Sequence, residues 1–193
     1  MQDTMLRVPA DVSACGARPV RPVLTFAEAV NQAMRTLAEN PQTRFVGQSV
    51  RYDGATIFHS LEGVPMEQRI ELPVIEDFQM GYCLGLSLTG LLPICIFPRF
   101  DFLLLAANQL VNHLDKLPLF GWTPKVIIRT RVGSRTPLDA GPQHTQDHTL
   151  AFKVMCKTVH VERVSTVNEV LTAYQEAVAR EVSSLIVEAP CLP

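Results

Sequence analysis

The sequence has few charged residues for its length, and neither sign is concentrated in one place. Of its 193 residues 19% are charged, and 17 Lys and Arg stand against 19 Asp and Glu. Proteins that bind nucleic acid or anionic membranes by electrostatic attraction usually carry a basic patch or stripe. Since no basic cluster stands out along this chain, we expect neither nucleic acid nor a membrane as its partner.

Cysteines are few, and none of the paired spacings of zinc sites is present. The five are Cys15, Cys83, Cys95, Cys156 and Cys191. Their number is odd, and two of them lie in strongly apolar segments, where a thiol behaves as a small buried hydrophobe. The cysteines therefore predict no metal site and favour a reducing compartment, which we take to be the cytoplasm.

Long apolar segments of the kind that enter membranes are also missing. The first 21 residues have no apolar core of a signal peptide, and we expect them to form a loose N-terminal arm. The window 79–98 is free of charge, but it contains three glycines and Pro93 and changes its period midway. A buried helix followed by a buried strand explains this window better than a membrane span.

Strand and helix patterns alternate almost throughout the rest of the chain. We expect helices at 25–40, 77–88, 102–117, 148–155 and 166–179, and strands at 44–48, 69–75, 92–97, 125–130, 158–162 and 184–188. The strand "LPICIF" is apolar without interruption, as expected when helices cover both faces of a parallel sheet. The pattern predicts one domain over 22–193, a three-layer α/β/α fold with a mostly parallel sheet of about six strands.

Three segments follow the carboxyl ends of the predicted strands, where ligands bind in sheets of this kind. They are Glu76, the segment "PRFDF" at 98–102, and the long connection 131–147. A carboxylate at position 76 can simply interact with the exposed amide groups of a helix start, and we prefer that structural interpretation for Asp77. For Glu76, burial between "LPVI" and a charge-free helix would favour a protonated form that donates a hydrogen bond.

Other candidate residues keep a structural alternative. His144 and His148 are four residues apart, but the Gly-Pro before His144 favours a loop, and no third metal ligand is near in sequence. His144 is then either a polar loop residue or a proton-transferring group. Phe102 is either a core residue or a platform for a ligand. Gly81 and Gly85 permit close helix packing, within the fold or between subunits.

The sequence as a whole resembles a known family. Glu76 followed by four residues and then "GYCLG" resembles the motif of pyrimidine-binding domains in thiamine-diphosphate enzymes. The likeness is strongest to the beta subunit of the 2-oxo acid dehydrogenases that act on pyruvate or branched-chain 2-oxo acids. It covers about 24–188 and includes "GQSVRYDGATIF", "NQLVNHLDK" and "GPQHTQ". Transketolases are more distantly similar, sharing the glutamate and the Gly-Pro-x-His loop.

The resemblance implies a role for each of three residues. Glu76 would hydrogen-bond a ring nitrogen of the cofactor's aminopyrimidine and favour the imino tautomer that takes the proton from the thiazolium carbon. Phe102 would lie against the aminopyrimidine ring, and His144 would sit near the reacting carbon. The cofactors implied are thiamine diphosphate and Mg²⁺. The cofactor carries the chemistry, and the protein orients it.

The resemblance also implies a second subunit. The Gly-Asp-Gly and Asn pattern with which such enzymes hold Mg²⁺ and diphosphate is not found in this sequence. We therefore expect a separate alpha-type subunit to hold the metal and the diphosphate, in a heterotetramer of two chains of each kind. Gly81 and Gly85 are candidate contacts with it. Ile96 stands where the family usually has an acid, and Asn108 replaces an Asp, so the polar networks near the site differ from those of the family.

Function is predicted by this resemblance at the level of a class. We expect a split thiamine-diphosphate enzyme subunit that decarboxylates a 2-oxo acid and transfers the acyl or hydroxyalkyl unit to an acceptor. A transketolase-like subunit acting on a ketose and an acyloin-forming ligase subunit are alternatives. A non-catalytic scaffold subunit with the same fold is a further one. A stand-alone nucleotide-binding domain is not supported, since the chain has no glycine-rich phosphate fingerprint.

Overall fold

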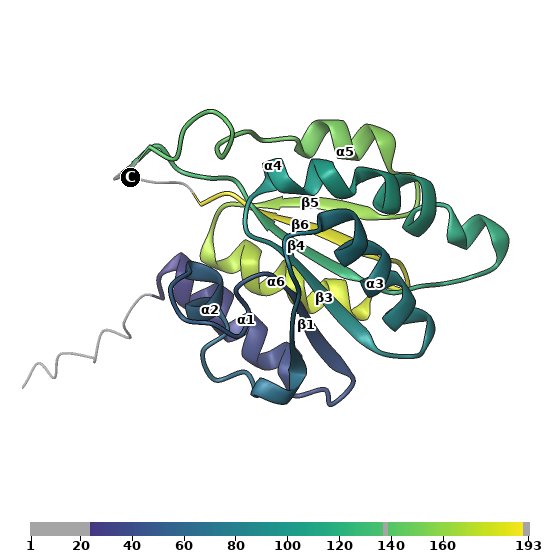
Figure 1. The fold of residues 1–193 in the computed structure, drawn as a ribbon, viewed down its shortest axis with the longest axis horizontal. Helices are drawn as coiled ribbons and strands as arrows, with labels where there is room; N and C mark the ends of the chain where they lie inside the picture. The colour runs from purple at the N-terminus through teal and green to yellow at the C-terminus, as the bar shows by residue number, and fades with distance from the viewer. Residues whose placement is uncertain (1–23, 137–138, 191–193) are drawn as a thin grey trace, which may run out of the picture.

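The computed structural model describes residues 24–136 and 139–190, as a sheet between two layers of helices (Figure 1). The predicted arm at 1–21 lies outside the described residues. The strands are β1 (Thr43–Gly47), β2 (Arg69–Glu71), β3 (Leu92–Phe97), β4 (Ile127–Arg131), β5 (His160–Val164) and β6 (Ser184–Glu188). The longer helices are α1 (Phe26–Ala38), α3 (Glu76–Leu88) and α6 (Val167–Ala179), and the shorter ones are α2 (Thr56–Ser60), α4 (Phe100–Leu103) and α5 (Thr149–Met155).

The six strands form one sheet in the order β2-β1-β3-β4-β6-β5, and every neighbouring pair is parallel. The predicted three-layer α/β/α fold is thereby confirmed. Strand β2 lies at one edge and ends at Glu71, two residues before Pro73, which cannot donate to a strand partner. Helix α3 and strand β3 confirm the helix-then-strand interpretation of 79–98, and no helix in the described part of the chain is long and apolar enough to cross a membrane.

Two hydrophobic cores lie on the two faces of the sheet, each beneath one of the helical layers that Figure 1 shows. On one face α1, α2 and α6 pack against the side chains of Phe45, Ile94 and Ile96. On the other face α3, α4 and α5 pack against Val46, Cys95 and their neighbours. Because helices cover both faces of the sheet, all six residues of β3 are buried. This explains why β3 is apolar at every position.

Helix boundaries follow the expected capping chemistry at both long helices that flank the first core. Thr25 and Glu28 form a capping box at the start of α1, and Thr166 and Glu169 form another at the start of α6. Gly90 follows α3 with a φ of 89°, a left-handed conformation that glycine adopts without a steric penalty.

The predicted helix at 102–117 is wrong as a single element. The chain passes through α4, a 3-10 turn η2 (Leu104–Ala106), a π-helical segment η3 (Gln109–Leu114) and a second 3-10 turn η4 (Leu117–Phe120). Each of these segments has only three to six residues, which is too short for the apolar pattern to distinguish one winding from another. Helix α2 and the 3-10 turn η1 (Met66–Gln68) lie between the predicted strands at 44–48 and 69–75, where we expected no helix.

A buried carboxylate explains why β5 begins two residues later than predicted. Asp115 is fully buried and accepts hydrogen bonds from the backbone amides of Lys157, Thr158 and Val159 at 2.8, 2.8 and 2.9 Å. Because Asp115 takes these amides, strand pairing starts only at His160. Burial alone would raise the pKa of Asp115, but the bonds from Lys116 and the three amides outweigh it and lower the pKa to about 2.

A second buried polar cluster joins β4 to β6. The Arg129 guanidinium donates to both carboxylate oxygens of Glu188, at 2.7 and 3.2 Å, and to the Ser60 hydroxyl at 2.7 Å. The Tyr174 hydroxyl donates to the same carboxylate at 2.7 Å. Burial would lower the pKa of Arg129, yet the adjacent Glu188 carboxylate raises it, so the guanidinium stays charged.

Candidate active site

Four segments meet at the carboxyl edge of the sheet. The residue after β1 is Gln48, α3 begins at Glu76 after β2, α4 carries Phe102 after β3, and the segment after β4 carries His144. These strands are neighbours in the sheet and all run in one direction, so their carboxyl ends lie together. The structure therefore brings the three residues predicted from the sequence, and Gln48, to the same edge.

Glu76 is the first residue of α3, and it is buried, with 6% of its surface exposed. Its Oε1 atom accepts a hydrogen bond from Gln48 Nε2 at 3.2 Å. Among the residues that the structure describes, no other side chain or amide donates to this carboxyl group. One carboxyl oxygen is thus held by a protein donor, and the other is available to a ligand.

Beside Glu76, the interior side of α3 is anchored by an amide. Gln79 is fully buried, and its Nε2 atom donates to the Ile96 carbonyl at 2.9 Å and contacts Cys95 Sγ at 3.5 Å. This links the first turn of α3 to β3, and it fixes where the Glu76 side chain starts. Gln79 Oε1 has no hydrogen-bond partner within the described residues.

Phe102 and His144 lie against each other although 42 residues separate them in the chain. Their rings meet edge to face, with centroids 5.4 Å apart and an interplanar angle of 82°. Both side chains are half-buried. Each ring therefore keeps a surface on which a flat ligand can pack, and the aromatic contact holds the imidazole in one orientation.

The segment that carries His144 folds back tightly on the end of β4. A Cβ atom placed on Gly133 would lie 1.9 Å from the His144 carbonyl oxygen, and 3.3 Å from Arg99 Nη1. Only glycine allows this approach. The His144 amide donates to the Gly141 carbonyl at 3.1 Å, and Gln146 Nε2 donates to Asp101 Oδ1 at 2.8 Å, which ties the segment to α4.

Positive charge collects beside the same edge. Arg131 ends β4, and burial together with the nearby Arg99 and Arg129 lowers its pKa, while Glu188 acts in the opposite direction. The guanidinium groups of Arg99, Arg129 and Arg131 thus lie near one another, and the Glu188 carboxylate is bonded to Arg129.

The two histidines that could have formed a metal pair do not lie together. The ring of His148 packs edge to face on Phe100, with centroids 5.4 Å apart, while His144 packs on Phe102. The described residues contain no group of three or more metal-ligating side chains.

The outer face of α3 is open and apolar. Phe78 is 51% exposed and stacks on Tyr82, with ring centroids 5.8 Å apart. Gly81 and Gly85 border a hollow of about 560 Å³ between them and Gln109. A Cβ atom on Gly85 would meet nothing within 4 Å. Close packing inside the described fold therefore does not account for this glycine, and its small size leaves room on an open surface.

Sequence reasoning missed Gln48 as a partner of Glu76, and it missed Gln79 as an anchor. The position of Gln48, directly after a buried strand, was a usable signal, because strand ends at this edge gather ligand-binding groups. Gln79 stands three residues after Glu76, one turn further along α3.

This arrangement suits a flat nitrogen heterocycle. A buried carboxyl group with one free oxygen can share a proton with a ring nitrogen, and the Phe102 ring offers a stacking surface. The same residues do not suit a metal with its anionic ligands, because the described part of the chain offers no metal-ligating cluster. The described residues can therefore hold the heterocyclic part of a ligand, but they offer no group of side chains for a part that binds through a metal ion.

Comparison with known proteins agrees with this description. The family described as "Transketolase, pyrimidine binding domain" matches residues 23–190. Among curated proteins, the mitochondrial pyruvate dehydrogenase E1 component subunit beta of Chaetomium thermophilum is 30% identical over 129 residues, which are 64% of this chain and 34% of that protein. The same subunit of Caenorhabditis elegans is 30% identical over 146 residues, 69% of this chain and 41% of that protein.

The chain spans well under half the length of these relatives. Among solved structures, one titled "Split gene transketolase, inactive beta4 tetramer" superposes with a TM-score of 0.68 at 19% identity, covering 87% of this chain and 52% of that one. This likeness shows the fold alone. Since the family matches nearly the whole described chain, the protein belongs to the transketolase pyrimidine-binding domain family.

Proposed function

We propose that this chain is the pyrimidine-binding, beta-type subunit of a split thiamine-diphosphate enzyme. The enzyme decarboxylates a 2-oxo acid and transfers the acyl or hydroxyalkyl unit to an acceptor. The observation that carries the proposal is the buried Glu76 carboxyl group, which has one oxygen bound by Gln48 and the other free, at the edge where Phe102 and His144 meet.

Each residue has a defined task in this proposal. Glu76 holds and shares a proton with a ring nitrogen of the aminopyrimidine, and its buried position limits competition from water. Phe102 packs on the face of the ring. His144, fixed against Phe102, moves protons at the substrate side. When bound, thiamine diphosphate supplies the stabilisation of negative charge that decarboxylation requires.

The metal and the diphosphate belong to a partner in this proposal. We propose an alpha-type subunit that holds Mg²⁺ and diphosphate, in a heterotetramer of two chains of each kind. It would cover the open face of α3 around Gly81 and Gly85. The homology to the pyruvate dehydrogenase subunit beta supports such a pairing, and a cytoplasmic location of the complex remains a proposal.

The test compares the chain alone with the complex that it forms when co-expressed with the product of the neighbouring gene. We expect calorimetry to detect thiamine-diphosphate binding, in the presence of Mg²⁺, only in the complex. We expect Glu76→Gln to keep the assembly and to lower CO₂ release from pyruvate or branched-chain 2-oxo acids by about 10²- to 10⁴-fold, the usual size of a lost acid-base group.

The matched control is Glu67→Gln, which makes the same change at an exposed glutamate outside the site. This variant should retain the turnover of the unaltered complex. A well-assembled complex that binds no cofactor would contradict the proposal and favour a scaffold subunit. Cofactor binding with transfer from a ketose, and without CO₂ release, would favour the transketolase-like alternative.

A further inference from the structure

The connection from β1 to α2 begins with a turn that is sterically unfavourable. Ser49 has a φ of 57°, and it is the single non-glycine residue with positive φ among the described residues. A left-handed conformation is unfavourable for a residue with a Cβ atom, because that atom approaches the following carbonyl oxygen. Such a conformation persists when surrounding interactions hold it in place.

The Glu71 carboxylate supplies those interactions. Glu71 is the last residue of β2, and it accepts hydrogen bonds from three successive backbone amides, those of Ser49 at 2.6 Å, Val50 at 2.8 Å and Arg51 at 2.9 Å. Successive amides that converge on one anion are a strong local arrangement, because each bond is charge-assisted. Neither a neutral nor an apolar side chain at position 71 reproduces it.

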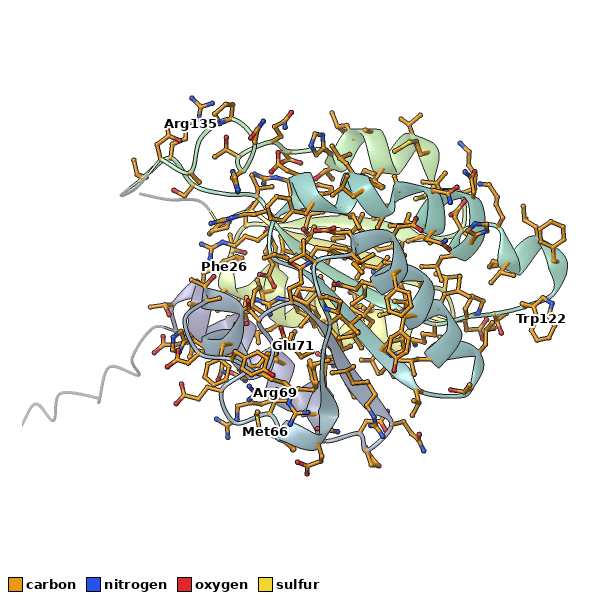
Figure 2. All side chains as sticks on the ribbon, in the orientation of Figure 1. Phe26, Met66, Arg69, Glu71, Trp122 and Arg135 are labelled. Atoms are coloured by element: carbon orange, nitrogen blue, oxygen red, sulfur yellow. The ribbon has the colours of Figure 1, made fainter. Side chains whose placement is uncertain are left out.

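Arg69, on the same short strand, binds backbone carbonyl groups of the chain between β1 and β2. Its guanidinium donates to the carbonyls of Val50 at 3.1 Å, Leu61 at 2.5 Å and Val64 at 2.9 Å. Figure 2 labels both side chains, which lie close together on β2. The edge strand thus holds the 48–51 segment with an anion at three of its amides and a cation at the Val50 carbonyl.

The residue that opens this segment is Gln48, the hydrogen-bond donor to Glu76. An amide NH₂ group donates hydrogen bonds and does not accept a proton. The bonded oxygen, Oε1, therefore acts as the acceptor, and Oε2 is left for contact with a ligand. Gln48 in this position decides which oxygen of Glu76 is free to share a proton with a ligand.

We propose that Glu71 is a positioning residue, which holds the 48–51 segment so that Gln48 fixes the proton-sharing oxygen of Glu76 toward the aminopyrimidine. The inference rests on the proposed function and deepens it. Glu71 itself touches neither cofactor nor substrate. Its effect reaches Glu76 through the backbone of Ser49 and the side chain of Gln48.

The experiment uses two variants, Glu71→Gln and Gln48→Met, with Glu67→Gln as control. The first removes the charge and part of the accepting capacity of the carboxylate. The second removes the donor and leaves the 48–51 backbone in place. Glu67 is exposed and lies on η1, four residues before Glu71. Its variant makes the same Glu→Gln change at a residue that has no role in the proposal.

The first readout needs the folded chain alone. The side-chain amide signals of Gln48 in ¹⁵N–¹H spectra are identified by their loss in Gln48→Met. In Glu71→Gln we expect these signals to move toward the positions of a free glutamine amide, while they stay unchanged in Glu67→Gln. Unchanged Gln48 signals in a folded Glu71→Gln chain would overturn the proposal.

The second readout uses the complex with thiamine diphosphate and Mg²⁺ and needs no substrate. It is the rate at which the thiazolium C2 proton of the bound cofactor exchanges with deuterium from solvent. We expect a decrease of about tenfold or more in both variants, since small misplacements of an acid-base group have effects of this order or larger. If Glu71 and Gln48 only stabilised the loop, the two substitutions would lower the melting temperature and leave this exchange rate unaltered.

The outcomes separate the two proposals. Cofactor binding with an exchange rate equal to that of the unaltered complex in both variants overturns the role of Glu71 and Gln48 and leaves the proposed function standing. Absence of binding in the unaltered complex contradicts the proposed function, and this inference falls with it.

Discussion

At the scale of single residues, the candidate site depends on contacts that leave no room for a larger side chain. Gly133 is the sharpest example, because the Cβ atom of any other residue would overlap the His144 carbonyl. The constraint is steric and lies in the backbone, so rotation of a side chain cannot relieve it. The position of the His144 ring against Phe102 is therefore linked to the absence of a side chain at position 133.

We predict that Gly133→Ala displaces His144 and lowers the free energy of unfolding by about 1 to 3 kcal/mol, the usual cost of overpacking. The imidazole proton signals of His144, assigned through His144→Gln, should lose the ring-current shift from Phe102. Gly85→Ala is the control, since its Cβ atom meets nothing and alanine favours a helix. Retention of the His144 shift in Gly133→Ala would contradict the prediction.

Sequence alone located Glu76, Phe102 and His144 at one edge of the sheet, because strand ends can be found from apolar patterns. It did not find that Gln48 contacts Glu76 or that Gly133 contacts His144. These contacts depend on which strands are neighbours in the sheet, and no local sequence pattern indicates the order of β2, β1 and β3. The catalytic roles of the three predicted residues stay predictions.

At the scale of secondary structure, the regular elements were predictable and the irregular ones were not. Strands β3 and β6 have the bounds that were predicted from the sequence, and capping boxes mark α1 and α6. The path from α4 to η4 was not predictable, because its winding is set by contacts distant in sequence. Asp115, which follows η3, binds amides more than forty residues away.

The Asp115 contact predicts an acid-dependent loss of stability. The pKa of this carboxyl group falls from 3.8 to about 2 on folding, so its contribution is present above pH 4 and is lost as pH falls through about 2. The difference corresponds to about 2 kcal/mol. We expect Asp115→Asn to be less stable than the unaltered chain by at least this amount at pH 7, and we expect the gap to narrow below pH 4.

Urea unfolding at pH 7, 5, 3 and 2.5 measures this gap, and Glu181→Gln, a change at an exposed carboxylate, is the control. A gap that stays constant from pH 7 to pH 2.5 would show that Asp115 does not lose its amide partners by protonation.

At the scale of the whole molecule, one side carries apolar groups that the described chain does not cover. The outer face of α3 continues into the region of η4, where Leu119, Phe120 and Trp122 are 68%, 74% and 59% exposed. Trp122 stands at the far end of the molecule from Glu71 in Figure 2. Exposed apolar surface of this extent is typical of a subunit that docks on another protein.

Trp122 is the single tryptophan of the sequence, so its fluorescence reports on this surface alone. We predict that its emission shifts to shorter wavelength when the proposed alpha-type partner is added to the purified chain, because the indole ring leaves water. If the partner contains tryptophan, its own emission is measured separately and subtracted from that of the mixture. An assembled complex with unshifted emission would place the docking surface elsewhere.

The order of the strands has a consequence for the way this protein is made. Strands β1, β2 and β3 are neighbours in the sheet and also come first in the chain. During synthesis, which proceeds from the N-terminus, this half-sheet is complete before the later strands leave the ribosome. Glu76, Gln48 and Glu71 are therefore all synthesised before His144, the residue that faces Phe102. The carboxyl group of Glu76 is thus present in the nascent chain before the imidazole of His144.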